Sequence, residues 1–150
     1  MKLEDEIKQV KAFKNEYSKA IVNIIFTYNW LDASSKAFFS DFEITSQQYN
    51  ILRILKGQSP NPSTINLLRE RMLDKMCDAS RLVERLRLKG LVDRTPAASD
   101  KRAVDITITD KGLELLKLIE LKLPSFEKRF ETLSEAEIEN LNNLLDKLRG

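Results

Sequence analysis

The sequence predicts a mainly α-helical fold that carries one small β-hairpin. Apolar residues recur at spacings of three and four over most of the 150 residues, which is the period of amphipathic helices. The period changes once, to strict alternation of apolar and polar residues between positions 103 and 109, which is typical of a half-buried strand. At this length, and without a low-complexity linker, residues 1–150 are expected to form a single domain.

The N-terminal part is predicted to be one long helix from Leu3 to about Leu31. Its apolar stripe follows helical spacing and consists of Ile7, Val10, Phe13, Tyr17, Ala20, Ile21, Ile24 and Ile25. The pattern from Asp32 to Phe42 is less regular, and this segment either continues as a short helix or closes a loop over the core.

Three shorter helices are expected next. The first follows a capping box at Thr45-Ser46-Gln47-Gln48 and ends near Gly57. The second covers about residues 63–71, and the third covers about residues 75–89 with Asp74 as its N-cap. Because so short a connection joins them, the second and third helices predict a helix-turn-helix.

A β-hairpin is predicted directly after the third of these helices. Residues 91–95 form the first strand candidate, residues 96–101 the loop and residues 103–109 the second strand. The apolar side chains that alternate along the second strand are Val104, Ile106 and Ile108. A hairpin in this position is the wing of a winged helix-turn-helix.

The segment after the hairpin is helical again and too rich in leucine for a single amphipathic face. Pro124 is expected to kink or interrupt this helix, since proline removes one ladder bond and clashes with the preceding turn. A second capping box, Ser134-Glu135-Ala136-Glu137, opens a terminal helix. The leucine surplus predicts that helices within about residues 1–35 and 113–150 pair with a second copy, and that about residues 45–112 form the winged lobe.

Composition excludes most enzyme classes. The chain has no His and a single Cys, Cys77, so Ser-His-Asp and Cys-His catalysis, zinc sites and internal disulfides are not expected. It also lacks the glycine-rich motifs that hold nucleotide phosphates. We therefore expect no enzyme activity, no cofactor and no metal. With no apolar run of about 18 residues and no signal peptide, the chain is expected to be cytoplasmic, without membrane contact.

Positive charge is concentrated in the middle of the chain. Residues 69–102 hold ten Lys and Arg against six Asp and Glu, a net charge of +4, while the remainder carries −2. A basic centre within a neutral scaffold is typical of a surface that binds a polyanion. The alternative is a solvated helical face.

The chain resembles the MarR family of transcription regulators over nearly its whole length. The resemblance is carried by residues 80–86 and 89–94, which match the pattern rLxxkGLvxR, and by residues 99–104 and 108–112, which match the DxR wing and the closing lTxxG. It implies a homodimeric, sequence-specific DNA-binding regulator. We expect a repressor on a pseudo-palindromic operator that a small ligand releases. The alternative is a winged-helix protein-interaction module without DNA binding.

The resemblance also assigns roles to residues of the wing. It implies that Asp100 orients Arg102 and that Arg102 enters the minor groove. Lys101, between them, is also expected to contact DNA. A narrow, electronegative minor groove attracts an arginine, and a neighbouring carboxylate can order its guanidinium. The alternative for Asp100 and Arg102 is an ordinary surface ion pair, worth about 0–1 kcal/mol.

The third helix is the expected recognition helix. The residues that its apolar face leaves pointing outward are Cys77, Asp78, Ser80, Arg81, Glu84 and Arg85. Those expected to bind DNA are Lys75, Cys77, Asp78, Ser80, Arg81 and Arg85. Arg81 is expected to read guanine bidentately and Ser80 to bind phosphate. At the start of the preceding helix, Ser63 and Thr64 are expected to contact phosphate.

Two of these residues depart from the family pattern. Asp78 stands where the family carries an uncharged polar residue; an acid repels phosphate, although it can accept from a cytosine amino group. Cys77 is either a reactive thiol, its pKa lowered by the helix and by Lys75, or simply a small residue beside the DNA.

Aromatic residues suggest an effector site. A pocket for a small aromatic or anionic ligand is predicted between the dimer helices and the winged lobe, lined by Phe26, Trp30, Phe38, Phe42 and Tyr49. The alternative is that this cluster is plain core.

Overall fold

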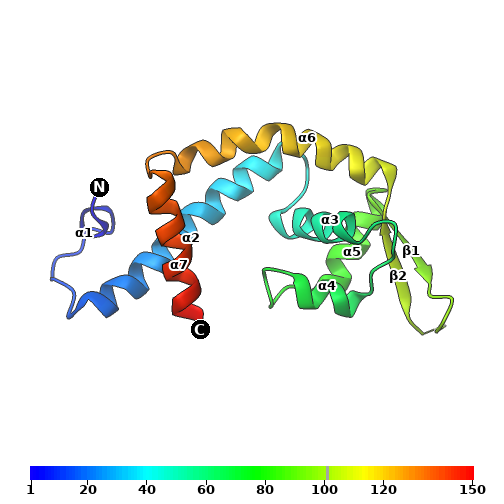
Figure 1. Cartoon of the computed structure of the whole chain (residues 1–150), viewed down its shortest axis with the longest axis horizontal. Coiled ribbons are helices and arrows are strands. Elements are labelled where there is room, and N and C mark those ends of the chain that lie inside the picture. The colour runs from blue at the N-terminus through cyan, green and yellow to red at the C-terminus, as the bar shows by residue number, and fades with distance from the viewer. Residues whose placement is uncertain (101) are drawn as a thin grey trace. The chain divides into compact units, whose positions relative to one another are not determined.

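The structure of the chain is a computed structural model, which describes residues 1–100 and 102–150 (Figure 1). Helices and one two-stranded antiparallel hairpin make up its regular structure, which confirms the predicted fold class. Residues divide into two compact units, 1–46 and 47–150. Nowhere in the described ranges is a helix both long enough and apolar enough to cross a lipid bilayer.

The first unit holds two helices, α1 (Leu3–Glu6) and α2 (Glu16–Ser40), so the prediction of one unbroken helix was wrong. Lys8 has a φ of 53°, in the left-handed region that ends a right-handed helix. Asn15 is extended, and its side-chain oxygen accepts the Ser18 N–H at 2.8 Å, which caps a new helix. A continuous helix between α1 and α2 would bury little of the predicted apolar stripe in this chain, because Val10 is 97% exposed.

Helix α2 reaches further than its regular pattern indicated. It runs through the irregular segment to Ser40, so that segment is helical rather than a loop. Glu43, with a φ of 56°, takes the left-handed conformation just beyond the helix end. An ion pair of 2.6 Å between Glu4 and Lys19 joins α1 to α2.

The second unit begins with three helices, α3 (Ser46–Gln58), α4 (Ile65–Arg71) and α5 (Ala79–Leu88). Their apolar faces meet in a core whose fully buried members include Ile51, Leu52, Leu55, Leu68, Val83 and Leu86. The helix-turn-helix of α4 and α5 was therefore predicted correctly in kind.

The start of α5 corrects the prediction. Its N-cap is Asp78, not Asp74: the Asp78 Oδ1 accepts the Arg81 N–H at 3.0 Å. Asp74 instead closes a tight turn, because its Oδ1 accepts the Met76 N–H at 2.9 Å. Both residues can cap a helix, and the chain uses one for the turn and the other for the helix.

The hairpin consists of β1 (Val92–Pro96) and β2 (Val104–Ile108), paired from Val92 with Ile108 to Pro96 with Val104. Ile106, in the middle of β2, is fully buried, while Val104 and Ile108 are half-buried. The chain segment before α4 adds a further bridge, since Ser63 and Ile106 exchange two backbone hydrogen bonds of 2.8 Å. These contacts attach the base of the wing to the helical core.

Two glycines make the hairpin base possible. Gly90 ends α5 with a φ of 73°, and its carbonyl accepts the Thr109 hydroxyl at 2.7 Å. A Cβ on Gly112 would collide with the Leu91 carbonyl oxygen and lie 2.7 Å from Cγ1 of Ile108. The closing Thr109-to-Gly112 motif is thus a close backbone contact between the hairpin and the next helix.

The chain ends with α6 (Asp110–Glu127), a 3₁₀ turn (Lys128–Phe130) and α7 (Glu135–Arg149). Of the two outcomes expected at Pro124, interruption of the helix was wrong, since α6 continues through it to Glu127, and the kink stays a prediction. The loss of one ladder bond near a helix end is not sufficient to stop the helix. The capping box of α7 is confirmed, because Ser134 and Glu137 each bond the other's backbone N–H.

Candidate nucleic-acid interface

Helix α5 has a buried apolar face and an exposed polar face. Ala79, Val83 and Leu86 are buried, whereas Ser80 and Arg81 are exposed. Arg85, one turn later, is exposed as well. The structure therefore places three of the predicted contact residues on the outer surface of one helix.

Asp78 has a structural task that explains an acid at this position. Its carboxylate accepts the Arg81 N–H and so satisfies a free amide at the positive end of the helix. The side chain that departs from the family pattern is thus the N-cap of α5, a role that the sequence analysis did not assign to it.

Lys75 and Cys77 lie before α5 rather than on it, which corrects their predicted placement. The Lys75 Nζ donates to the Glu70 carbonyl of α4. Burial, followed by the negative charge of Asp74, raises the pKa of the Cys77 thiol. Of the two readings of Cys77, this direction of the pKa favours the small residue over the reactive thiol, because burial and the nearby carboxylates both disfavour the thiolate.

Of the two residues predicted to contact phosphate at the start of α4, one is exposed and the other is buried. Thr64 is the N-cap, exposed, and its Oγ1 accepts the Leu67 N–H at 3.2 Å. Its hydroxyl proton remains available to an acceptor. Ser63 is only 1% exposed and its backbone pairs with Ile106, so the prediction that it contacts DNA was wrong. The backbone pairing of Ser63 with Ile106 of β2 keeps the Ser63 side chain buried.

The tip of the wing carries Asp100 and Arg102, both exposed. The Asp100 Oδ1 accepts the backbone N–H of Arg102 at 2.9 Å, and the Asp100 carbonyl accepts the Ala103 N–H at 3.0 Å. Asp100 thus orders the backbone from which Arg102 projects. Lys101, the third predicted contact residue of the tip, lies outside the described residues.

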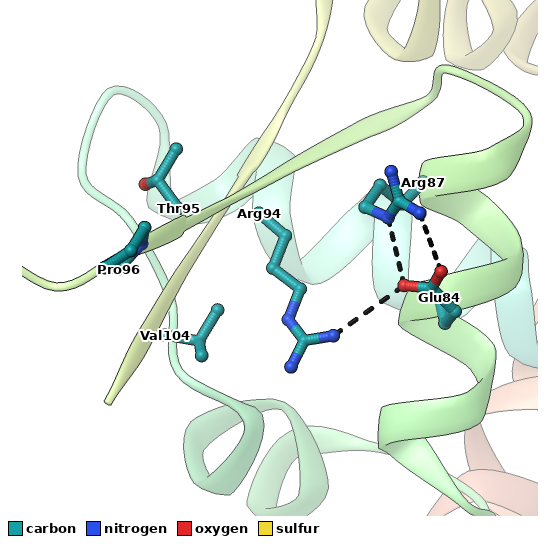
Figure 2. A pocket seen from close by; sticks show the side chains of 6 residues that line it. All are labelled: Glu84, Arg87, Arg94, Thr95, Pro96 and Val104. Atoms are coloured by element: carbon teal, nitrogen blue, oxygen red, sulfur yellow. Dashed lines mark hydrogen bonds and ion pairs between the residues drawn. The ribbon is translucent and has the colours of Figure 1, made fainter. Parts of the chain in front are cut away.

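A charged cluster that the sequence analysis missed joins α5 to β1 (Figure 2). Glu84 binds Arg87 through two hydrogen bonds of 3.0 and 2.8 Å, and its Oε2 lies 3.7 Å from Arg94 Nη1. The three side chains line an open hollow of about 460 Å³ between the recognition helix and the wing. The spacing of Glu84 and Arg87 on one helix signals their pairing, but no local pattern signals Arg94.

This cluster also has an electrostatic consequence. The hydrogen bonds from Arg87, with the positive charges of Arg87 and Arg94, hold the pKa of Glu84 below its ordinary value. Glu84 is therefore ionised at neutral pH and neutralises part of the positive charge beside the wing.

The aromatic residues of the predicted effector pocket fall in both units. Phe26, Trp30 and Phe38 lie on α2 and Phe42 lies just after it, with the Phe38 and Phe42 rings 5.5 Å apart. Tyr49 lies on α3 in the second unit, where burial raises the pKa of its hydroxyl. The pocket itself stays a prediction. Among residues 1–100 and 102–150, no group of three metal-binding side chains gathers.

The chain was compared with known proteins to identify its family. No protein-family model matches the chain. A MarR transcription factor from Planctomyces limnophilus, known from a crystal structure, is 31% identical; the match covers 90% of this chain and 98% of that one, with a TM-score of 0.69. This chain belongs to the MarR family of transcription regulators. The resemblance indicated by the sequence is thus confirmed.

Two further proteins resemble this chain. The transcriptional repressor IacR of Pseudomonas putida is 29% identical over 85 residues, which cover 56% of this chain and about half, 51%, of IacR. The C80S mutant of MarR from E. coli, crystallised with operator DNA, shares the fold with a TM-score of 0.77 at 22% identity, over 92% of this chain and 99% of that one.

Proposed function

We propose that this MarR-family regulator is a cytoplasmic, homodimeric repressor that binds a pseudo-palindromic DNA operator. One observation carries the proposal: α5 exposes Ser80, Arg81 and Arg85, and the hairpin that follows it carries Arg102, whose backbone N–H is bonded by Asp100. A helix for the major groove and a cationic hairpin for the minor groove are the two parts that such a protein needs.

The relatives support the same function. IacR is described as a repressor, and E. coli MarR was crystallised with its operator. Neither of these relatives is described as a protein-interaction module. No feature described for this chain favours that alternative over DNA binding, so we retain DNA binding as the single candidate function.

We assign the base contacts to the first turn of α5. Arg81 reads guanine through its two parallel donors, which match the O6 and N7 acceptors of that base. Ser80 donates its hydroxyl to a phosphate, and Arg85 reaches the backbone one turn further along. Cys77 and Asp78 border this contact, with Asp78 holding the helix end that supports Arg81.

The wing and the start of α4 supply the remaining contacts. Arg102 enters the minor groove, and Lys101 adds charge for the flanking phosphates. Thr64 and Lys75 contact the backbone on the other side of the recognition helix. These contacts position the protein on DNA, whereas the α5 residues select the sequence.

The second copy is expected to cover apolar side chains that the single chain leaves in water. In the first unit these are Ile21, Ile25 and Tyr28 of α2; in the second they are Leu144 and Leu148 of α7. Exposed patches of this kind mark protein interfaces. The division into a winged lobe, about residues 45–112, and dimerisation helices, about 1–35 and 113–150, follows from this proposal.

A small aromatic or anionic effector completes the proposal. The aromatic residues Phe26, Trp30, Phe38, Phe42 and Tyr49 provide the apolar surface for it. Such a ligand changes DNA binding only if it binds the DNA-competent and the released dimer with unequal affinity.

Selection of binding sites from random-sequence duplexes tests the proposed function. We expect enrichment of two inverted half-sites whose centres lie about one helical turn, 34–36 Å, apart. Recovery of no common sequence by a folded, dimeric protein would overturn the proposal.

A further inference from the structure

The turn that leads into the recognition helix displays two large apolar side chains to water. Leu73 is 87% exposed and Met76 is 93% exposed. Burial of such a side chain stabilises a fold, and neither residue makes that contribution to the folded chain. Single exposed apolar residues are common on protein surfaces. Whether these two have a function therefore depends on how the turn that carries them is held.

The turn is held firmly from both sides. The Leu73 N–H donates to Asn50 Oδ1 of α3 at 2.9 Å, and the Met76 N–H donates to Asp74 Oδ1 at 2.9 Å. Gln47 of α3 binds the other oxygen of Asp74 at 3.4 Å. At its start Met72 is 1% exposed and anchors the turn in the core. An ordered backbone therefore presents Met76 outward.

The position of Met76 indicates what it contacts. It lies two residues before the N-cap Asp78, at the same end of α5 as Ser80 and Arg81. In the major groove, the C5 methyl of thymine is the apolar group on the base edges. Methionine is unbranched and polarizable, so its side chain adapts to such a partner.

We propose that Met76 is a specificity-determining residue that contacts a thymine C5 methyl group in the major groove. The inference rests on the proposed function and extends it to one further position of each half-site. It predicts a preference for thymine that does not depend on hydrogen bonding to that base.

Replacement of operator thymines by deoxyuridine tests this contact, because uracil lacks only the methyl group. Each half-site of the selected operator is expected to hold one thymine that Met76 contacts. Replacing one such thymine by uracil should lower the affinity of the wild-type protein about four-fold, which corresponds to about 0.8 kcal/mol for one buried methyl. Met76→Ala should bind the thymine and uracil operators equally, whereas Met76→Leu should keep the discrimination.

Two variants serve as controls. Leu88→Ala removes another exposed apolar side chain, 71% exposed, at the opposite end of α5, and should keep the uracil effect. Leu73→Ala should keep it too. Undiminished uracil sensitivity in Met76→Ala, its loss in Leu73→Ala instead, or a dimer that dissociates in Met76→Ala would each overturn the inference.

The failure of this inference is distinguishable from that of the proposed function. A wild-type protein that binds its selected operator, with no thymine where uracil matters, overturns the role of Met76 alone. A wild-type protein that selects no operator overturns both.

Discussion

The Asp100 carboxylate of the wing bonds the main chain of Arg102: its Oδ1 lies 2.9 Å from the Arg102 backbone nitrogen. A residue-by-residue resemblance suggests that the acid orients the arginine, and the structure shows a bond through which it can do so. The carboxylate holds the backbone N–H of Arg102, the residue that we propose enters the minor groove.

This relationship separates two substitutions at the wing tip. Asp100→Ala removes the acceptor and should weaken operator binding about three- to ten-fold, the range expected for one net hydrogen bond. Asp100→Asn also removes the charge but keeps an oxygen acceptor, and should bind more tightly than Asp100→Ala in a fluorescence anisotropy titration. Equal affinities of the two variants would show that the hydrogen bond has no part in binding.

Arg81→Ala is expected to relax sequence preference. If Arg81 reads a guanine, its loss removes about 1–3 kcal/mol of discrimination at one base pair in each half-site and leaves other positions unchanged. Competition assays with single-base operator variants measure this. Arg87→Ala is the matched control, since Glu84 already binds that guanidinium. A uniform loss of affinity at every position would assign Arg81 to the phosphates.

Glu84 should make stability depend on pH in acid. Arg87, first, and Arg94 lower the pKa of Glu84 in the folded chain. A lowered folded-state pKa means that the contribution is present above the ordinary glutamate pKa and is lost as the pH falls through the lowered value. Urea unfolding of wild type and Glu84→Gln should therefore differ most near neutral pH and converge in acid. A difference that stays constant with pH would contradict this account.

Gly112→Ala should destabilise the fold by about 1–3 kcal/mol, because its Cβ overlaps the Leu91 carbonyl and Ile108. Gly57→Ala is the matched control: it lies within α3, and no atom lies within 4 Å of the added Cβ. That variant should be about 0.5–1 kcal/mol more stable than wild type. Thermal unfolding of both decides the matter, and a Gly112→Ala protein as stable as wild type would refute the proposed backbone contact.

The sequence predicted element types well and element starts less well, for identifiable reasons. The alternation of Val104, Ile106 and Ile108 and the capping box at Ser134 are local signals, and the strand and the helix cap that they predict both appear in the structure. The start of α5 was misplaced because Asp74 and Asp78 have the same capping chemistry. Only the packing of the turn against Asn50 and Gln47 of α3 assigns each its role.

Long-range contacts account for the errors at the site. Ser63 looks like an exposed helix start, yet it pairs with Ile106, 43 positions later, and is buried. Arg94 meets Glu84 only because the hairpin folds back beside α5. At the N-terminus the apolar stripe extends through Val10, but a left-handed Lys8 and the Asn15 cap divide the helix. Neither periodicity nor motif spacing encodes the contacts of Ser63 and Arg94, whereas the break in the N-terminal helix is local, since Asn15 caps α2 through Ser18.

The dependence of operator affinity on salt tests the central claim most directly. If the recognition helix and wing of each copy engage DNA as proposed, six or more phosphate contacts should weaken binding by about 10³-fold or more between about 50 and 200 mM salt, with the operator preferred over a scrambled duplex throughout. An affinity that stays flat over this range and is equal for both duplexes would contradict the account.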